Sequence, residues 1–157
     1  MTNEGLSCKA AGMESELLAA EDYASVLRAT QLLSSRYLHG MTLNARMEAW
    51  AEFVADVEEG FDTMWAWEFD NDMAHRDWLH DAWPILTERV CQLRQSELDA
   101  LDERFRVATV PIKPFGMNQS AMSQQARWWQ FRYPRLVTGD PAEELPSTWS
   151  PVPTYID

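Results

Sequence analysis

Apolar residues recur every three or four positions through the middle of the chain. They occupy positions Met47, Trp50, Val54, Val57, Phe61 and Met64. This spacing is typical of an α-helix that buries one face, which Trp65 is expected to widen. It predicts a central helix that is capped by Thr42 or Asn44 and reaches Phe69. Gly60 weakens a helix at this point, so we expect another helix or an aromatic ring to approach closely there.

The same period predicts helices before and after the central one. A first helix is expected within residues 13–38. Asp70-Asn71-Asp72 interrupts the pattern and can cap a further helix of about ten residues. Pro84 suits the first residue of the next helix, because its missing N–H is not needed there. That helix either runs with a kink to Ala108 or gives way to a separate helix that begins near Ser96.

Beyond residue 109, prolines and glycines interrupt every regular pattern except a short helix expected around residues 120–126. We therefore predict an all-α protein, a four- to five-helix bundle with an irregular Pro/Trp-rich C-terminal segment packed on it. Residues 1–12 are expected to form a flexible arm, residues 13–109 the bundle, and residues 110–157 the irregular part of the same domain.

Size and composition narrow the class of protein. A chain of 157 residues with 46% hydrophobic residues can bury one core. No apolar run is long enough to cross a membrane, and the first residues lack the apolar stretch of a secretory signal. The two cysteines, Cys8 and Cys91, are far apart and are expected to be reduced thiols, which predicts a cytoplasmic protein.

The negative charge is concentrated in the middle of the chain. The net charge is −12, and residues 48–81 hold eleven acidic residues against the single base Arg76, a net of −10. Residues 110–137 contain four bases and no acid. A charge of this sign and size argues against nucleic acids and anionic membranes as partners, because both are themselves negative. It favours a basic protein as the partner.

Four acidic residues lie on the outer side of the predicted central helix. They follow one another at steps of four, four and three: Glu48, Glu52, Asp56 and Glu59. Like charges at this spacing repel each other. One interpretation is a solvated surface that keeps the protein in solution. A second is that the arginines of the C-terminal segment, Arg127, Arg132 and Arg135, pair with these acids. A third is a surface that binds a cationic partner.

Polar residues also continue the apolar stripe toward the next helix: Glu68, Asn71, Asp72, His75 and Arg76. Such groups are costly to bury unless they are paired. They are interpreted as a structural polar network, in which Arg76 is the local partner of Asp72. The alternative is a site for one divalent metal ion, held by Glu68, Asp72 and His75, with His39 as a further ligand. The chain lacks a glycine-rich phosphate loop, a G-x-S-x-G motif and paired cysteines.

Three short patterns together resemble a group of small acidic helical proteins of bacteria. They are Trp50-x-x-Phe53-Val54-x-x-Val57-Glu58-x-Gly60, Asn71-Asp72-x-x-x-Arg76 and Leu101-Asp102-x-Arg104-Phe105-x-x-Ala108-Thr109. The resemblance covers residues 47–110 and implies a compact helical fold without a particular chemistry. By size, acidity and helicity the chain is also similar, in general terms, to toxin-immunity proteins.

These observations favour a non-catalytic, acidic protein-binding module. We expect Glu48, Glu52, Asp56 and Glu59 to contact a basic protein such as a toxin, which an immunity or antitoxin protein would neutralise. The alternative function is a helical-bundle metal-binding protein or enzyme that uses Glu68, Asp72 and His75. Neither a nucleic acid nor a membrane is expected as a partner.

Overall fold

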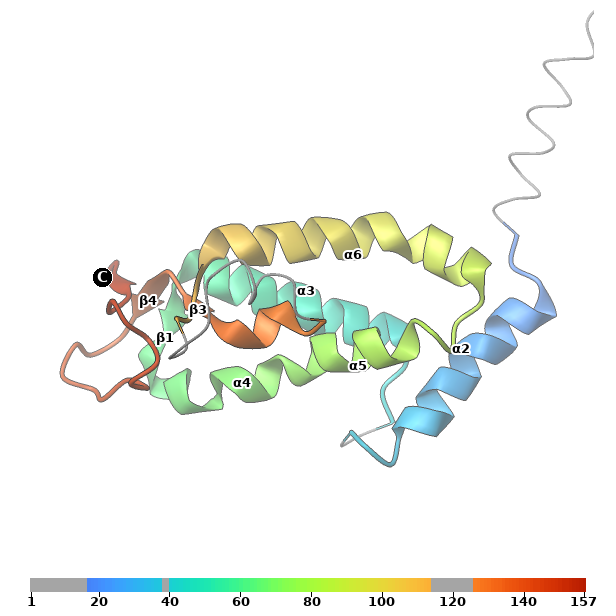
Figure 1. Cartoon of the computed structure of the whole chain (residues 1–157), viewed down its shortest axis with the longest axis horizontal. Coiled ribbons are helices and arrows are strands. Elements are labelled where there is room, and N and C mark those ends of the chain that lie inside the picture. Colours follow the sequence, from blue (N-terminus) through green and yellow to red (C-terminus); the bar gives the residue numbers. More distant parts are fainter. Residues whose placement is uncertain (1–16, 38–39, 114–125) are drawn as a thin grey trace, which may run out of the picture.

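The computed structural model describes residues 17–37, 40–113 and 126–157 (Figure 1). The α-helices are α2 (Ala20–Leu33), α3 (Leu43–Gly60), α4 (Phe69–Asp72), α5 (Ala74–Ala82) and α6 (Glu88–Ala108). The 3-10 helices are η1 (Thr63–Glu68) and η2 (Trp128–Phe131). The strands are β1 (Phe61–Asp62), β2 (Thr109–Pro111), β3 (Arg132–Pro134), β4 (Leu136–Thr138) and β5 (Thr154–Tyr155).

Three helices form the centre of the molecule. Figure 1 shows α3 and α6 running in the same direction and α4 and α5 running the opposite way, with α2 leaning against one end. Helix α3 contacts both α5 and α6. Threonines begin both long helices: Thr42 Oγ1 accepts from the Ala45 N–H at 3.2 Å, and Thr87 Oγ1 accepts from the Val90 N–H at 3.4 Å. The cap of α3 at Thr42 is thus one of the two that the sequence predicts.

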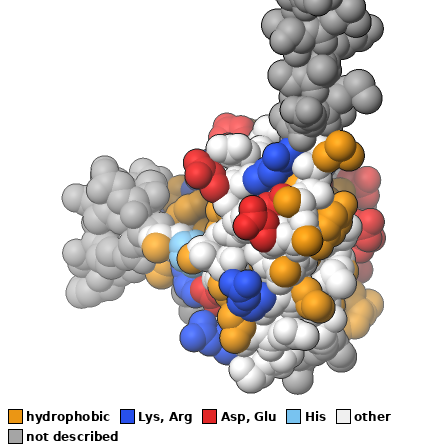
Figure 2. All heavy atoms as spheres, turned by 90° about the vertical axis from the view of Figure 1, so that its right-hand side faces the viewer, with side chains coloured by type: hydrophobic (Ala, Val, Ile, Leu, Met, Phe, Trp, Pro, Cys, Tyr) orange, Lys and Arg blue, Asp and Glu red, His pale blue; other side chains and the backbone are white. Residues whose placement is uncertain are grey.

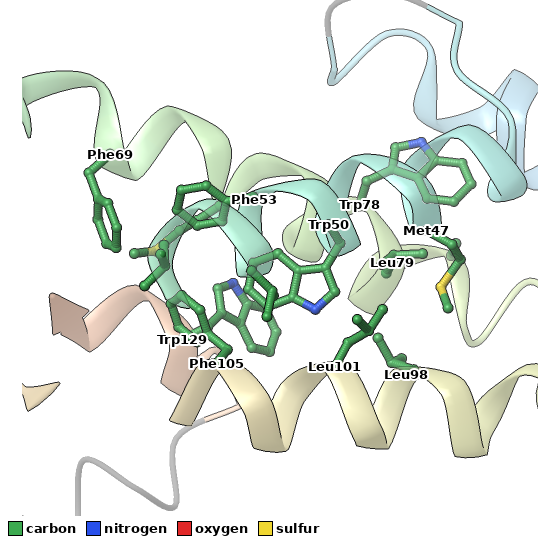
Figure 3. Packing of buried hydrophobic residues seen from close by; sticks show 14 of the residues in the cluster. Met47, Trp50, Phe53, Phe69, Trp78, Leu79, Leu98, Leu101, Phe105 and Trp129 are labelled. Atoms are coloured by element: carbon green, nitrogen blue, oxygen red, sulfur yellow. The ribbon is translucent and has the colours of Figure 1, made fainter. Parts of the chain in front are cut away.

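The core is rich in aromatic rings (Figure 3). Trp50 and Phe53 of α3 pack on Phe105 of α6, with ring centroids 4.9 and 6.1 Å apart, and Phe53 also lies 5.2 Å from Phe69. Tilted contacts at these distances are favourable beyond the apolar area that they bury. The predicted apolar stripe is therefore buried along α3, but Met64 at its far end is 61% exposed.

The prediction of an all-α helical bundle is wrong, because the fold also contains two small sheets. Strands β1, β4 and β5 form a parallel sheet in the order β1-β4-β5, and β2 pairs with β3 antiparallel. Each strand has two or three residues, too few for an alternating pattern to show. Their partners are far along the chain: Phe61 lies opposite Val137, and Val137 opposite Tyr155.

The central helix ends at Gly60 and does not reach Phe69. Gly60 has a φ of 112°, a left-handed conformation that glycine adopts without strain. A Cβ at this position would lie 2.6 Å from Ile156 Cδ1 and 3.0 Å from Thr138 Cγ2. A close approach therefore exists at Gly60, but Ile156 and Thr138 of the C-terminal segment make it, and not a helix or an aromatic ring. The left-handed conformation of Gly60 turns the chain out of α3 into β1.

The later helices also differ from their predicted bounds. Pro84 lies in the turn between α5 and α6, and α6 begins only at Glu88. From there it runs as one continuous helix to Ala108, so Ser96 does not begin a separate helix. The predicted arm of residues 1–12, the start of the predicted first helix and residues 120–125 of the short helix lie outside the described residues.

A buried ion pair ties the helices together. Arg76 of α5 donates to both carboxylate oxygens of Asp102 on α6, from Nε at 2.9 Å and from Nη2 at 3.0 Å. Trp50 of α3 donates its indole N–H to the same carboxylate at 3.2 Å. The Arg76 guanidinium also lies over the Trp129 ring, 4.2 Å from its centroid. One charge-assisted network therefore joins α3, α5, α6 and η2.

Replacing Asp102 with alanine should lower the free energy of unfolding by about 3–5 kcal/mol, because Arg76 would stay buried without its counter-charge. The matched control is Glu58→Ala. The Glu58 carboxylate on α3 pairs with Arg104 on α6, so this substitution also removes an ion pair between two of the central helices. The side chains of that Arg104–Glu58 pair are 48% and 35% exposed, against 10% and 8% for Arg76 and Asp102. Its loss should cost less than about 1 kcal/mol. Urea unfolding measures the change in the free energy of unfolding for each variant. Equal changes would contradict the conclusion that burial makes the Arg76–Asp102 pair the more important one.

Candidate functional site

The outer side of α3 carries the acidic face, which consists of Glu48, Glu52, Asp56 and Glu59. All four side chains are exposed. They lie opposite the buried side of the helix, where Trp50, Val54 and Val57 pack. Within the described residues, no lysine or arginine forms an ion pair with any of the four. Their mutual repulsion is therefore not offset by a neighbouring cation there.

Glu58, the remaining glutamate in this part of α3, behaves differently. It lies on the side that faces α6, where its carboxylate accepts from Arg104 Nε at 3.1 Å. This hydrogen bond, together with the nearby positive charge, holds the pKa of Glu58 below its ordinary value. The arginine on α6 thus reaches the flank of α3 but leaves the acidic face unpaired.

Arg127 of the C-terminal segment pairs with α5. Its Nη1 lies 3.0 Å from Asp77 Oδ1, and its Nη2 lies 2.7 Å from Asp81 Oδ1. Trp129 donates to the same Asp77 oxygen at 2.8 Å, and Tyr37 donates its hydroxyl to Asp81 at 2.6 Å. Burial and the Asp81 carboxylate raise the pKa of Tyr37 to about 12. Tyr37 therefore stays protonated at neutral pH and serves as a hydrogen-bond donor.

Arg132 and Arg135 bind the C-terminal end of α6. Arg132 donates to Thr109 Oγ1 at 2.7 Å and to the Arg106 carbonyl at 3.0 Å. Arg135 donates to the Val107 carbonyl at 3.3 Å. Unpaired carbonyls and the negative end of the helix dipole both attract cations at this position. The interpretation in which these arginines neutralise the central helix is therefore wrong.

The acidic face continues beyond α3 onto α4. Asp72 is half-buried, and its pKa is raised by that burial first and then by the charges of Asp56 and Glu68. Burial also raises the pKa of Asp70. Carboxylates of α3, η1 and α4 thus lie close enough to influence one another, and together they widen the negative surface.

A group of large apolar side chains lies beside these acids. The tryptophan corner consists of Met64, Trp65 and Trp67 on η1, which are 61%, 55% and 62% exposed. Trp67 donates its indole N–H to the Glu144 carbonyl at 3.1 Å. An α-helical period places Met64 and Trp65 in the core, so sequence reasoning missed this group. The sequence feature that marks this group is two tryptophans close together between acidic residues. That feature does not by itself indicate that their side chains are exposed.

Exposed apolar side chains also occur on α2, at Tyr23, Leu27 and Leu32. Figure 2 shows that end of the molecule, where apolar side chains are scattered among charged groups of both signs. This mixture is ordinary for a protein surface. It provides a comparison for the tryptophan corner, which is flanked by the carboxylates of Asp62 and Glu68.

The proposed metal ligands do not form a ligand set. His75 Nδ1 accepts a hydrogen bond from Arg46 Nη1 at 3.0 Å, which places a fixed positive charge beside the ring. Burial and this charge lower the pKa of His75. In the part of the chain that the structure describes, no three His, Cys, Asp or Glu side chains come together in a way that could hold a metal ion. His39 lies outside the described residues.

The predicted polar network is divided between two places. Arg76 takes Asp102 as its partner and not Asp72, which is four residues away in sequence. His75 belongs to the contact with Arg46, a buried residue that also lies over the rings of Tyr37 and Trp78 at 5.5 and 5.7 Å. The remaining members, Glu68, Asn71 and Asp72, lie at or near the surface: Glu68 and Asn71 are exposed and Asp72 is half-buried. The Arg76–Asp102 and Arg46–His75 contacts stabilise the core. Glu68, Asn71 and Asp72 belong to the acidic surface.

A shallow groove between α2 and α5 is lined by Leu32, Leu33, Arg36, His80 and Asp81. It brings an imidazole and a carboxylate to one surface, the kind of pair that proton-transfer chemistry uses. Asp81, however, is already held by Tyr37 and Arg127. The carboxylate therefore holds the C-terminal segment against α5, which is a structural role.

Comparison of the chain with protein-family models, with curated proteins and with solved structures finds no match. The resemblance to small acidic bacterial proteins accordingly stays a hypothesis. No helix among the described residues combines the length and apolarity that crossing a membrane requires.

Replacing Asp72 with asparagine should stabilise the protein at pH 7 by roughly a few tenths of a kcal/mol, since it removes a carboxylate whose charged form is disfavoured first by burial and then by the charges of Asp56 and Glu68. The pKa of Asp72 is raised in the folded state, so its ionisation destabilises the fold. The gain should be complete above that raised pKa and vanish below the ordinary value of 3.8, where the wild-type carboxyl is protonated in both states. Urea unfolding from pH 3 to 7 measures it. Glu143→Gln, which removes an exposed charge elsewhere, should show no such pH-dependent gain.

The imidazole of His75 should titrate below its ordinary pKa of 6.5, because the folded protein buries it beside Arg46. The folded state holds the ring neutral, so stability is complete above 6.5 and declines as the pH falls. Arg46→Met removes one of the two causes and should move the pKa of His75 upward. NMR titration of the ring protons measures both proteins. A wild-type pKa at or above 6.5 would contradict the contact.

Proposed function

We propose that this protein is a non-catalytic, acidic protein-binding module that presents the acidic face to a basic protein. One observation carries the proposal. The four carboxylates Glu48, Glu52, Asp56 and Glu59 are exposed and unpaired within the described residues. Arg104 of α6, and Arg127 and Arg132 of the C-terminal segment, have other partners. A surface of this kind gains its counter-charges from another molecule.

Such a face lowers stability in the free protein and raises the rate of association. Neighbouring carboxylates on α3 repel each other, and Asp72 adds to this repulsion. A cationic partner removes that cost when it binds. Its approach is also steered by the field of the whole protein, whose net charge is −12.

The partner's chemistry follows from the same charges. Nucleic acids and anionic membranes are repelled by this surface, and a protein with a lysine- or arginine-rich patch is attracted. An immunity or antitoxin protein that neutralises a basic toxin is the concrete form of this function. We place it in the cytoplasm, where widely separated cysteines stay reduced.

The double substitution Glu52→Lys with Asp56→Lys should weaken binding of a basic probe, a 16-residue peptide of alternating lysine and glycine, by at least about fivefold at low ionic strength. The matched control is Glu97→Lys with Glu103→Lys on α6, which changes the net charge equally but lies outside the acidic face. It should weaken binding much less. Fluorescence anisotropy of the labelled peptide at several salt concentrations measures this.

Two results would contradict the proposal. One is an affinity that does not depend on salt, since contacts between charges at a surface are screened by ions. The other is an equal loss in both double variants, which would show that net charge alone attracts the peptide.

A further inference from the structure

The tryptophan corner is exposed because of the backbone path of η1. This element is two short 3-10 turns joined by a kink at Trp65, whose φ of −103° and ψ of 15° are not helical, and residues three apart in such turns lie on the same edge. Thr63 and Ala66 are buried on the inner edge, which leaves Met64, Trp65 and Trp67 outside. Small side chains therefore take the inner positions and large apolar ones the outer positions. Exposing tryptophan in this way forgoes a large gain in burial, which is a feature of binding surfaces.

Carboxylates flank the corner on both sides. Asp62 precedes η1 and accepts a hydrogen bond from the Met64 N–H at 2.9 Å. Glu68 ends η1 and is exposed, and its charge reaches Asp72, as does that of Asp56 on the acidic face. The tryptophans thus lie at the edge of one continuous negative surface.

The chain itself shows what a tryptophan beside a carboxylate binds. Arg106 lies over the Trp128 ring at 3.9 Å and pairs with Glu103 at 3.5 Å. Arg76 lies over Trp129 at 4.2 Å and pairs with Asp102. A planar guanidinium can stack on a ring and bond a carboxylate at once, which an ammonium group does less well. The tryptophan corner has the ring and the carboxylates, and no arginine of the described ranges lies over it.

We propose that the tryptophan corner is the anchor of the interface and that it binds an arginine-rich segment of the partner, in which arginines alternate with aliphatic or aromatic residues. This inference rests on the proposed function, since the acidic face supplies the charges around the anchor. The arginines stack on Trp65 and Trp67 and reach Asp62 and Glu68. The apolar residues of the segment cover Met64 and the parts of the rings that the arginines leave exposed. Tryptophans that become buried when two proteins bind supply much of the affinity of the interface.

The test compares two peptide probes of 16 residues and equal charge, one of alternating arginine and leucine and one of alternating lysine and glycine. The wild-type protein should bind the arginine–leucine peptide at least about tenfold more tightly. Trp65→Ala with Trp67→Ala should abolish that difference and leave the weaker lysine–glycine binding unchanged. Leu27→Ala with Leu32→Ala, which removes exposed apolar side chains from α2, is the matched control and should change neither affinity.

A second measurement uses the unaltered protein, so it does not depend on the folding of a variant. Oxidative footprinting read by mass spectrometry should show that the arginine–leucine peptide protects Trp65 and Trp67 from modification, and that the lysine–glycine peptide does not. Absence of protection at both rings would overturn the proposal.

The remaining outcomes separate the two proposals. If the tryptophan variant keeps the preference for the arginine–leucine peptide while Glu52→Lys with Asp56→Lys weakens both peptides, the anchor is overturned and the acidic face stands. If that charge variant binds both peptides as the wild type does, the acidic face itself is overturned. If the free protein dimerises and the tryptophan variant does not, the corner binds a second copy of the chain, and the arginine-rich partner is overturned.

Discussion

The buried ion pair between Arg76 and Asp102 is the contact on which the rest of the structure depends. It joins α5 to α6, takes a hydrogen bond from Trp50 on α3 and lies beneath the Trp129 ring. A carboxylate and a guanidinium can remain in an apolar core only when each satisfies the other, so the relative positions of these elements are narrowly set. That arrangement turns the outer side of α3, with its four exposed carboxylates, to solvent.

Much of the helical structure can be predicted from local pattern. The stripe from Met47 to Phe61 and the capping threonine Thr42 indicate α3, because both signals lie within a few residues of each other. The sheets cannot be found in this way, since β4 has three residues and its partner residues lie 76 positions before them, as Phe61 and Val137 do, and 18 after them, as Val137 and Tyr155 do. The end of α3 depends on the same distant contact, through Ile156 and Thr138 against Gly60.

The two parts of the candidate site also differ in how far local sequence pattern predicts them. The acidic face is predictable, because outward positions follow once the buried side of α3 is known. The tryptophan corner is not, because the chain leaves α3 at Gly60, passes through β1 and enters η1, which is kinked at Trp65. This path turns Met64 and Trp65 outward, and no local sequence pattern indicates it. The partner of Arg76 is also beyond local pattern, since Asp102 lies 26 residues away while Asp72 is four residues away.

The parallel sheet has a consequence for the order of events during synthesis. The strand that leads into η1 is held by β4, which is held in turn by β5, so residues near position 155 help to place a segment near position 65. A ribosome adds these residues long after α3 has left the exit tunnel, and domains form as units once their parts are present. The nascent chain can therefore form α3 with its acidic face before the strands that hold β1 and η1 in place exist. The proposed interface would be complete only once β5 has been made.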